Sequence, residues 1–70
     1  MKEIFKKILE EKLKDIIIAY EYLGLILHIE VNDKFIIIDD CHYEVEELNY
    51  EYLDTIIQDF KIQIIRKAIT

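Results

Sequence analysis

The chain of 70 residues contains no proline, no tryptophan and no serine, and it has a single glycine and a single cysteine. Without serine, catalysis by a serine nucleophile is excluded. Gly24 alone cannot form a glycine-rich loop that cradles phosphate. Cys41 alone cannot support a disulfide-stabilised scaffold. These absences exclude several classes of enzyme and of small secreted protein.

Long uncharged stretches are also missing. The longest run without a charged residue is 22–29, whereas a membrane-spanning helix needs about 18 or more apolar residues. Charges recur through the first 15 residues, so no secretory signal is expected. Hydrophobic residues nevertheless make up 53% of the chain, too many for a disordered protein. We therefore expect a single domain over 1–70, located in the cytoplasm and not an enzyme.

Residues 3–23 have the periodicity of an amphipathic helix, which Gly24 would end in a left-handed conformation. Charged residues fall on the opposite side to this apolar arc: Ile4, Phe5, Ile8, Leu9, Leu13, Ile16, Ala19, Tyr20 and Leu23. The run Ile16-Ile17-Ile18 is β-branched and conflicts with this interpretation. The alternative is a helix over 2–14 followed by a strand over 16–22.

Residues 25–40 predict an antiparallel hairpin with a two-residue loop at Asn32-Asp33. This loop would pair Val31 with Lys34, Ile29 with Ile36 and Leu27 with Ile38. One face would then form the core, and its residues are Leu25, Leu27, Ile29, Val31, Ile36 and Ile38.

The remainder of the chain predicts one more strand or an acidic loop, followed by a helix. Residues 42–48 alternate weakly, with Tyr43 and Val45 on one side. Asn49 is suited to cap a helix, whose buried stripe is Leu53, Ile56, Ile57, Phe60 and Ile64. Alternation over 60–64 leaves a final strand as the alternative. The fold class that follows is α+β, with an N-terminal helix, an antiparallel hairpin or three-stranded sheet, and a C-terminal helix.

Charge is strongly segregated along the chain. The formal charge is −6 overall, and residues 39–59 carry −8 with no lysine or arginine. Such a surface attracts basic partners. If 42–48 are extended, Glu44 and Glu46 project from one face roughly 6.6 Å apart, similar to successive phosphates of a nucleic-acid strand. The same segment can also be a solvated face that only favours solubility.

From this segment we predict a site that binds a basic protein surface, with the tyrosines as anchors because tyrosine is common at interface hot spots. The predicted residues are Asp39, Asp40, Tyr43, Glu44, Glu46, Glu47, Tyr50, Glu51, Tyr52, Asp54 and Asp59. Direct binding of nucleic acid is not expected, because acidic residues interrupt the N-terminal lysines. Binding to a membrane is not expected either.

Asp39-Asp40-Cys41-His42 contains four side chains that can bind a metal, but adjacent residues of an extended chain point to opposite faces. We therefore expect no metal site and no cofactor. A Cys41–His42 nucleophilic pair is also disfavoured, because acidic neighbours raise the pKa of a thiol.

The last helix has apolar residues on a second side, namely Ile62, Ile65 and Ile69. A helix that is apolar on two faces is either buried twice or forms an oligomer contact. A homodimer, or a structural protein that self-assembles through these residues, is the alternative function.

The layout resembles that of small acidic phage anti-CRISPR proteins that inhibit Cas9. The features that match are the hairpin over 25–40, the acidic run from Asp39 to Asp59 and the two terminal helices. The likeness lies in layout and charge, without a shared motif, and the high isoleucine content departs from it. The resemblance implies a phage inhibitor whose acidic face mimics nucleic acid and blocks a basic groove of a nucleic-acid-binding effector.

Overall fold

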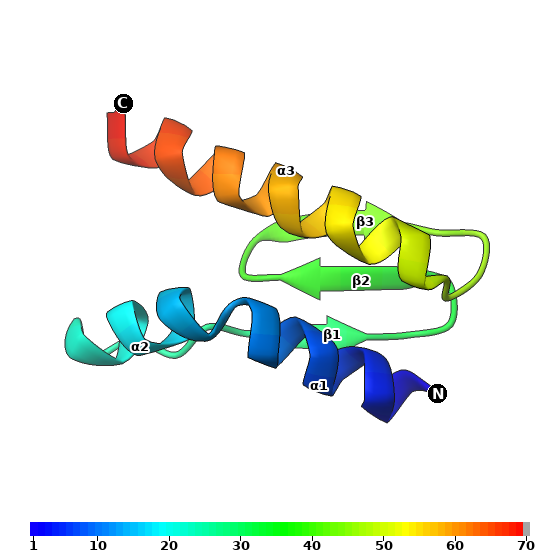
Figure 1. Ribbon diagram of the computed structural model, residues 1–70. Helices are drawn as coiled ribbons and strands as arrows, with labels where there is room; N and C mark the ends of the chain where they lie inside the picture. The colour runs from blue at the N-terminus through cyan, green and yellow to red at the C-terminus, as the bar shows by residue number, and fades with distance from the viewer. Residues whose placement is uncertain (70) are drawn as a thin grey trace.

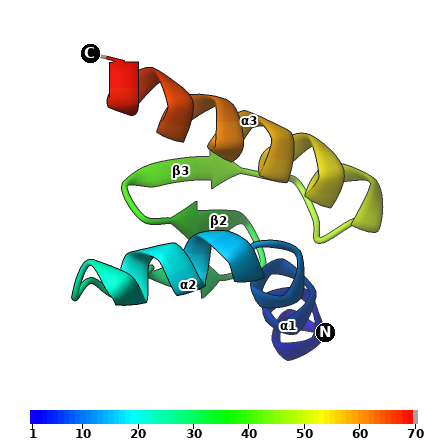
Figure 2. The ribbon, with the colours of Figure 1, turned by 60° about the vertical axis from the view of Figure 1, so that its left-hand side comes forward.

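The first 22 residues fold into two consecutive helices, α1 (Lys2–Lys12) and α2 (Lys14–Tyr22). The structure is a computed structural model and describes residues 1–69. The expected helix over 3–23 is thus interrupted at Leu13, and the alternative strand over 16–22 is wrong. Leu13 has φ −102° and ψ 13°, yet backbone bonds from Leu13 to Leu9 and from Ile17 to Leu13 continue across the break. Figure 2 shows α2 turning away from the axis of α1, which a periodicity analysis along a straight axis cannot detect.

The end of α2 is a Schellman motif centred on Gly24. Gly24 has φ +75°, and its N–H donates to the carbonyl of Glu21. The N–H of Leu25 donates to the carbonyl of Tyr20 over 2.9 Å. This pair of bonds satisfies two carbonyls that a helix end leaves without partners, so the prediction that Gly24 ends the helix is confirmed.

Three antiparallel strands form one sheet in the order β1-β2-β3 (Figure 1). They are β1 (Ile29–Val31), β2 (Phe35–Ile38) and β3 (Cys41–Glu44). The expected hairpin and third strand are both present, and the α+β class is confirmed. Asp39 and Asp40 connect β2 to β3, and Asp39 adopts a left-handed conformation with φ 57°, which aspartate tolerates better than most residues.

The register of the hairpin differs from the predicted one by two residues. Ile29 pairs with Ile38 and Val31 with Ile36, because the pair that closes the turn is Asn32 with Phe35. The two central residues of the turn are therefore Asp33 and Lys34, and neither Asn32 nor Asp33 has a positive φ. Because side chains alternate with a period of two, a shift of two residues leaves each side chain on its predicted face.

The C-terminal helix α3 (Tyr50–Ile69) begins where the sequence predicts. The Asn49 side-chain oxygen accepts a hydrogen bond of 2.9 Å from the N–H of Glu51, which is an N-cap. The helix continues through residues 60–64, so the alternative of a final strand is wrong. Of the helices within residues 1–69, none is both long and apolar enough to cross a lipid bilayer.

One face of the sheet and the inner sides of α1 and α3 enclose the core. Figures 1 and 2 place α1 alongside β1 and α3 alongside β3. The buried residues are Phe5, Leu9, Leu13, Leu27, Ile29, Ile36, Ile38, Leu53, Ile56, Ile57 and Phe60. Leu25 was expected in this core but is 52% exposed, because it follows Gly24 in the turn and precedes the sheet. Helix α2 contributes no buried residue.

We predict that Gly24→Ala lowers the free energy of unfolding by about 1 kcal/mol, because an L-residue with a side chain is disfavoured at positive φ. A Cβ at this position meets no atom within 4 Å, so the loss would come from the backbone alone. Gly24→Asn should cost less, since asparagine adopts the left-handed conformation more readily. Urea denaturation of the three proteins measures both changes, and equal stability of all three would contradict the prediction.

Candidate functional site

The acidic run from Asp39 to Asp59 does not form one continuous face. At one end of β3, Lys67 of α3 contacts both carboxylate oxygens of Asp40 and lies 3.9 Å from a carboxylate oxygen of Asp39. The hydroxyl of Tyr20 donates to Asp39 over 3.2 Å. These contacts connect α2, the β2–β3 turn and the last turns of α3, and they reduce the negative charge of this turn.

Titration of the Lys67–Asp40 pair reflects this contact. The hydrogen bond from Lys67 lowers the pKa of Asp40, and the same bond raises the pKa of Lys67. Both side chains are exposed. The contact is therefore present across the neutral range, lost at low pH when Asp40 takes up a proton, and lost at high pH when Lys67 releases one.

Two further carboxylates of the run have hydrogen-bond partners on other elements of the fold. Asp54 accepts a hydrogen bond of 3.1 Å from Lys12 of α1, which joins the two long helices at the surface. Asp59 accepts a hydrogen bond of 2.7 Å from the hydroxyl of Tyr43, which joins α3 to β3. Asp54 and Asp59 therefore already have partners within the chain.

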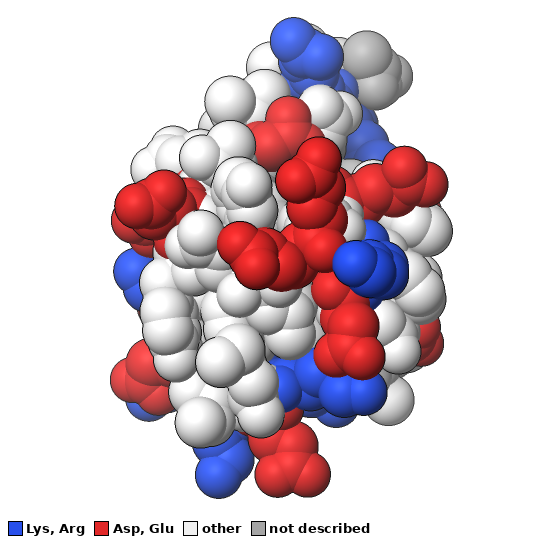
Figure 3. All heavy atoms as spheres, turned by 90° about the vertical axis from the view of Figure 1, so that its right-hand side faces the viewer, with Lys and Arg blue, Asp and Glu red and all other residues white. Residues whose placement is uncertain are grey.

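Four carboxylates remain at the other end of β3. Glu44 ends the strand, Glu46 and Glu47 lie in the following loop, and Glu51 lies in the first turn of α3. All four residues are exposed, and among residues 1–69 no ion pair involves them. Lys34 approaches this loop but donates to the backbone carbonyl of Glu46 over 2.9 Å. We name Glu44, Glu46, Glu47 and Glu51 the acidic end; Figure 3 shows acidic side chains over the middle of this side of the molecule, with basic side chains beside and below them.

A groove of about 520 Å³ lies beside the acidic end, between β3 and the N-terminal half of α3. Its walls include His42 and Glu44 from one face of β3 and Tyr43 from the other, together with Val45 and Glu46 from the start of the following loop. Helix α3 supplies Tyr52, Thr55 and Ile56. Because both faces of the strand contribute, the groove runs along the outer edge of β3.

The three tyrosines predicted as anchors have different surroundings. Tyr43 is half-buried, and its hydroxyl is bonded to Asp59. Tyr50 stacks on Phe5 with ring centroids 4.8 Å apart, so its ring covers the start of α1. Tyr52 is exposed and lines the groove. Of the three, Tyr52 is the one placed to contact a partner in this groove.

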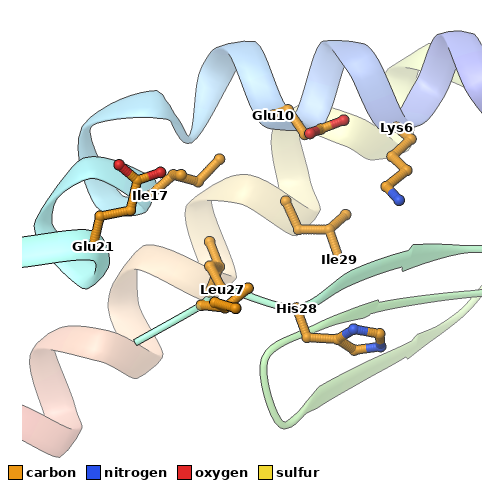
Figure 4. Close-up of a pocket in the computed structure, with 8 residues that line it drawn as sticks. Lys6, Glu10, Ile17, Glu21, Leu27, His28 and Ile29 are labelled. Atoms are coloured by element: carbon orange, nitrogen blue, oxygen red, sulfur yellow. The ribbon is translucent and has the colours of Figure 1, made fainter. Parts of the chain in front are cut away.

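A second groove, of about 340 Å³, lies between the N-terminal helices and the segment that leads into β1 (Figure 4). Figure 4 shows Lys6 and Glu10 of α1 above it, with Leu27 and Ile29 pointing toward the helices. Its charged residues are of both signs, including Lys6, Glu10 and Glu21. Its charge therefore does not favour a partner of one sign.

The second side of α3 is exposed, as the sequence indicated. Ile62, Ile65 and Ile69 are 47%, 58% and 78% exposed. Ile65 also lines a shallow groove of about 310 Å³ with Ile64 and with Ile16 of α2. Part of an apolar surface therefore lies between α2 and the last turns of α3.

Cys41 and His42 lie next to each other on β3 but face opposite sides of the sheet. Partial burial raises the pKa of the Cys41 thiol, and the charge of Asp40 adds to this, so the thiolate is disfavoured. His42 instead contacts the ring of Phe35, with centroids 5.1 Å apart. In the described part of the chain, no three His, Cys, Asp or Glu side chains converge on a point where a metal ion would fit.

The groove along β3 was not predicted from the sequence. Its walls come from residues 42–46 and 52–56, which are close in sequence, but their approach depends on how the intervening loop turns. The signal that was available is the alternation of 42–46, since a terminal strand of a small sheet leaves one edge open.

Comparisons with known protein families, with curated proteins and with solved structures find no match to this chain.

The Tyr43–Asp59 bond leads to a prediction about alkaline stability. Burial and the hydrogen bond to Asp59 raise the pKa of Tyr43 well above its ordinary value. A group whose pKa is raised on folding stabilises the fold below its unfolded pKa, about 10 for tyrosine, and this contribution is lost as the pH rises. Tyr43→Phe should lower the free energy of unfolding by about 1 kcal/mol at pH 7.

The pH dependence is the more specific part of that test. Between pH 9 and 11, the stability of the wild-type protein should fall more steeply than that of Tyr43→Phe. The Lys67–Asp40 pair is the same in both proteins, so its contribution cancels in the comparison. Denaturant midpoints measured across this pH range give the two slopes, and parallel slopes would show that Tyr43 does not titrate with unfolding.

Proposed function

We propose that the chain is a non-catalytic module that binds a basic protein surface through its acidic end and the adjoining groove. The observation that carries the proposal is the set of four exposed carboxylates, which form no ion pair within residues 1–69. Concentrated charge of one sign costs self-repulsion in the free protein and is relieved when a basic partner binds. Tyr52 adds an exposed aromatic ring beside this charge.

In its sharper form, the partner is a cytoplasmic protein that binds nucleic acid, and the module inhibits it by occupying the same basic groove. Two features support this form. The acidic end has the sign of charge that such a groove accepts. The arrangement of helices around a small antiparallel sheet is the layout in which the sequence resembles phage anti-CRISPR inhibitors.

The triple substitution Glu44→Gln, Glu46→Gln and Glu51→Gln tests the role of this charge. Because it removes three negative charges without changing shape, it should weaken partner binding at least tenfold and flatten the dependence of affinity on salt. A matched control, Glu3→Gln, Glu11→Gln and Glu21→Gln, removes the same charge from the N-terminal helices and should bind as the wild type does.

The measurement begins with capture of partners from a cell lysate and elution at increasing salt. The captured protein is identified, and its affinity for each variant is then measured by calorimetry at two salt concentrations. Addition of duplex DNA should displace the module if both occupy one groove. Equal affinity of the two triple variants would contradict the proposal.

A second candidate function is self-assembly through the exposed isoleucines of α3. The exposure of Ile62, Ile65 and Ile69 favours it, since contiguous apolar surface often marks an interface. This surface is separate from the acidic end, because it lies on the second half of α3 rather than at its start.

Ile65→Glu tests self-assembly. Because Ile65 is mostly exposed, the substitution should leave the fold intact, yet it places a charge in the proposed contact. The wild-type protein should then show a mass that increases with concentration in sedimentation equilibrium, and the variant should remain a monomer. A wild-type protein that stays monomeric at millimolar concentration would exclude this function.

A further inference from the structure

Strand β3 leaves one row of backbone groups without a partner in the sheet. The sheet ends at β3, and the N–H of Val45, just after β3, donates to the carbonyl of Lys34, just before β2. Residues whose backbone groups bond to the neighbouring strand alternate along an antiparallel pair. The backbone N–H and carbonyl groups of Tyr43 and Val45 therefore point toward the β2 side. The N–H and carbonyl groups of His42 and Glu44 therefore point outward, and among the described residues no backbone bond joins them to another element.

The groove described above lies along these outward-facing groups. On the side of the sheet that faces α3, its walls are mainly apolar and include Val45, Ile56 and the ring of Tyr52. On the opposite side, its walls are His42, Glu44 and Glu46. A strand added at this edge would place alternate side chains on these two sides, because successive residues of a strand point to opposite faces.

The negative charge along the edge of β3 determines which kind of strand could pair with it. If β3 of a second copy paired here, the carboxylates Glu44 and Glu46 of both chains would be brought together along one edge, and the gathering of like charges is destabilising. A strand whose outward side chains are lysine or arginine would instead form cross-strand pairs of opposite charge. The groove beside β1 lacks this preference, because Lys6 lies among its acidic residues.

We propose that the partner is bound by β-strand addition: an extended segment with alternating basic and apolar residues joins the sheet as a fourth strand, antiparallel to β3. The inference rests on the proposed function and specifies how the basic partner is recognised. Backbone bonds to His42 and Glu44 give affinity, and the two walls of the groove give the alternation of side chains.

The test uses a defined probe, the acetylated and amidated hexapeptide Lys-Val-Lys-Val-Lys-Val. A residue opposite Glu44 in an antiparallel pair exchanges both backbone bonds with it and has its side chain on the same face, so it is a lysine. N-methylation of the central lysine should weaken binding about tenfold, because it removes one such bond. N-methylation of the central valine is the matched control and should have little effect, because its N–H faces away from β3.

Amide hydrogen exchange locates the bound peptide. The amides of His42 and Glu44 should become protected when the peptide binds, whereas Tyr43 already pairs with β2 and the Val45 amide already bonds to Lys34, so these two should change little. Protection confined to other residues, or an equal loss of affinity for the two N-methylated peptides, would overturn strand addition.

A pair of variants separates the contribution of the Glu44 backbone N–H to peptide binding from that of its carboxylate. Glu44→Gln removes the carboxylate and keeps the N–H, whereas Glu44→Pro removes both and is tolerated on the open side of an edge strand. Glu44→Pro should bind the peptide at least fivefold more weakly than Glu44→Gln. If Glu44→Pro does not fold, the methylated peptides still decide the question.

Failure of this inference differs from failure of the proposed function. If the captured partner still depends on the four glutamates but the peptide shows no dependence on its backbone N–H, strand addition is wrong and the acidic end binds by side chains alone. If the triple glutamine variant binds the partner unchanged, the proposed function itself is wrong.

Discussion

The structure depends on the burial of one face of a three-stranded sheet by two helices. A chain of 70 residues supplies enough apolar material for a single core, and Leu9, Leu13, Ile36, Ile38 and Phe60 form its centre. Because α1 and α3 cover the same face, no element among residues 1–69 extends the sheet beyond β3 or covers its other side. The open edge, the groove beside it and the exposed half of α3 all follow from this arrangement. In a larger domain, a further strand or helix commonly covers such surfaces.

The carboxylates of the acidic run fall into two groups, those with a partner elsewhere in the fold and those without one. Asp39, Asp40, Asp54 and Asp59 connect elements that are distant in sequence through Lys67, Lys12 and Tyr43, and they help position α3 against the rest of the fold. Each exposed contact of this kind contributes little energy. These contacts matter for function because they determine which carboxylates of the run are left without a partner. The carboxylates without such contacts are concentrated at the loop between β3 and α3, so the free negative charge is localised although the sequence spreads it over 21 residues.

The element types, the hydrophobic faces and the cap at Asn49 could be predicted from the sequence because each depends on local periodicity or on one side chain. The break at Leu13 and the hairpin register could not, for different reasons. Leu13 keeps its helical hydrogen bonds while its backbone angles deviate, so the periodicity on either side remains intact. The register was wrong by two residues because Asn32-Asp33 and Asp33-Lys34 are both acceptable turn centres, and a shift of two preserves every face. The site was predicted as a continuous surface because a charge count along the chain contains no information about Lys12 and Lys67, which reach it from other elements.

The exposed carboxylates on β3 and in the following loop oppose pairing of this edge with a second copy of the chain. Edge strands in natural proteins commonly carry charges that oppose pairing with an identical strand. Glu44 and the nearby Glu46 and Glu47 serve this purpose here, because a second copy would bring the same charges into contact. Protection by negative charge is selective, however, since it opposes acidic strands and attracts basic ones. The charge that opposes pairing with a second copy therefore also has the sign that attracts a basic strand, and Tyr52 of α3 lies beside it in the groove.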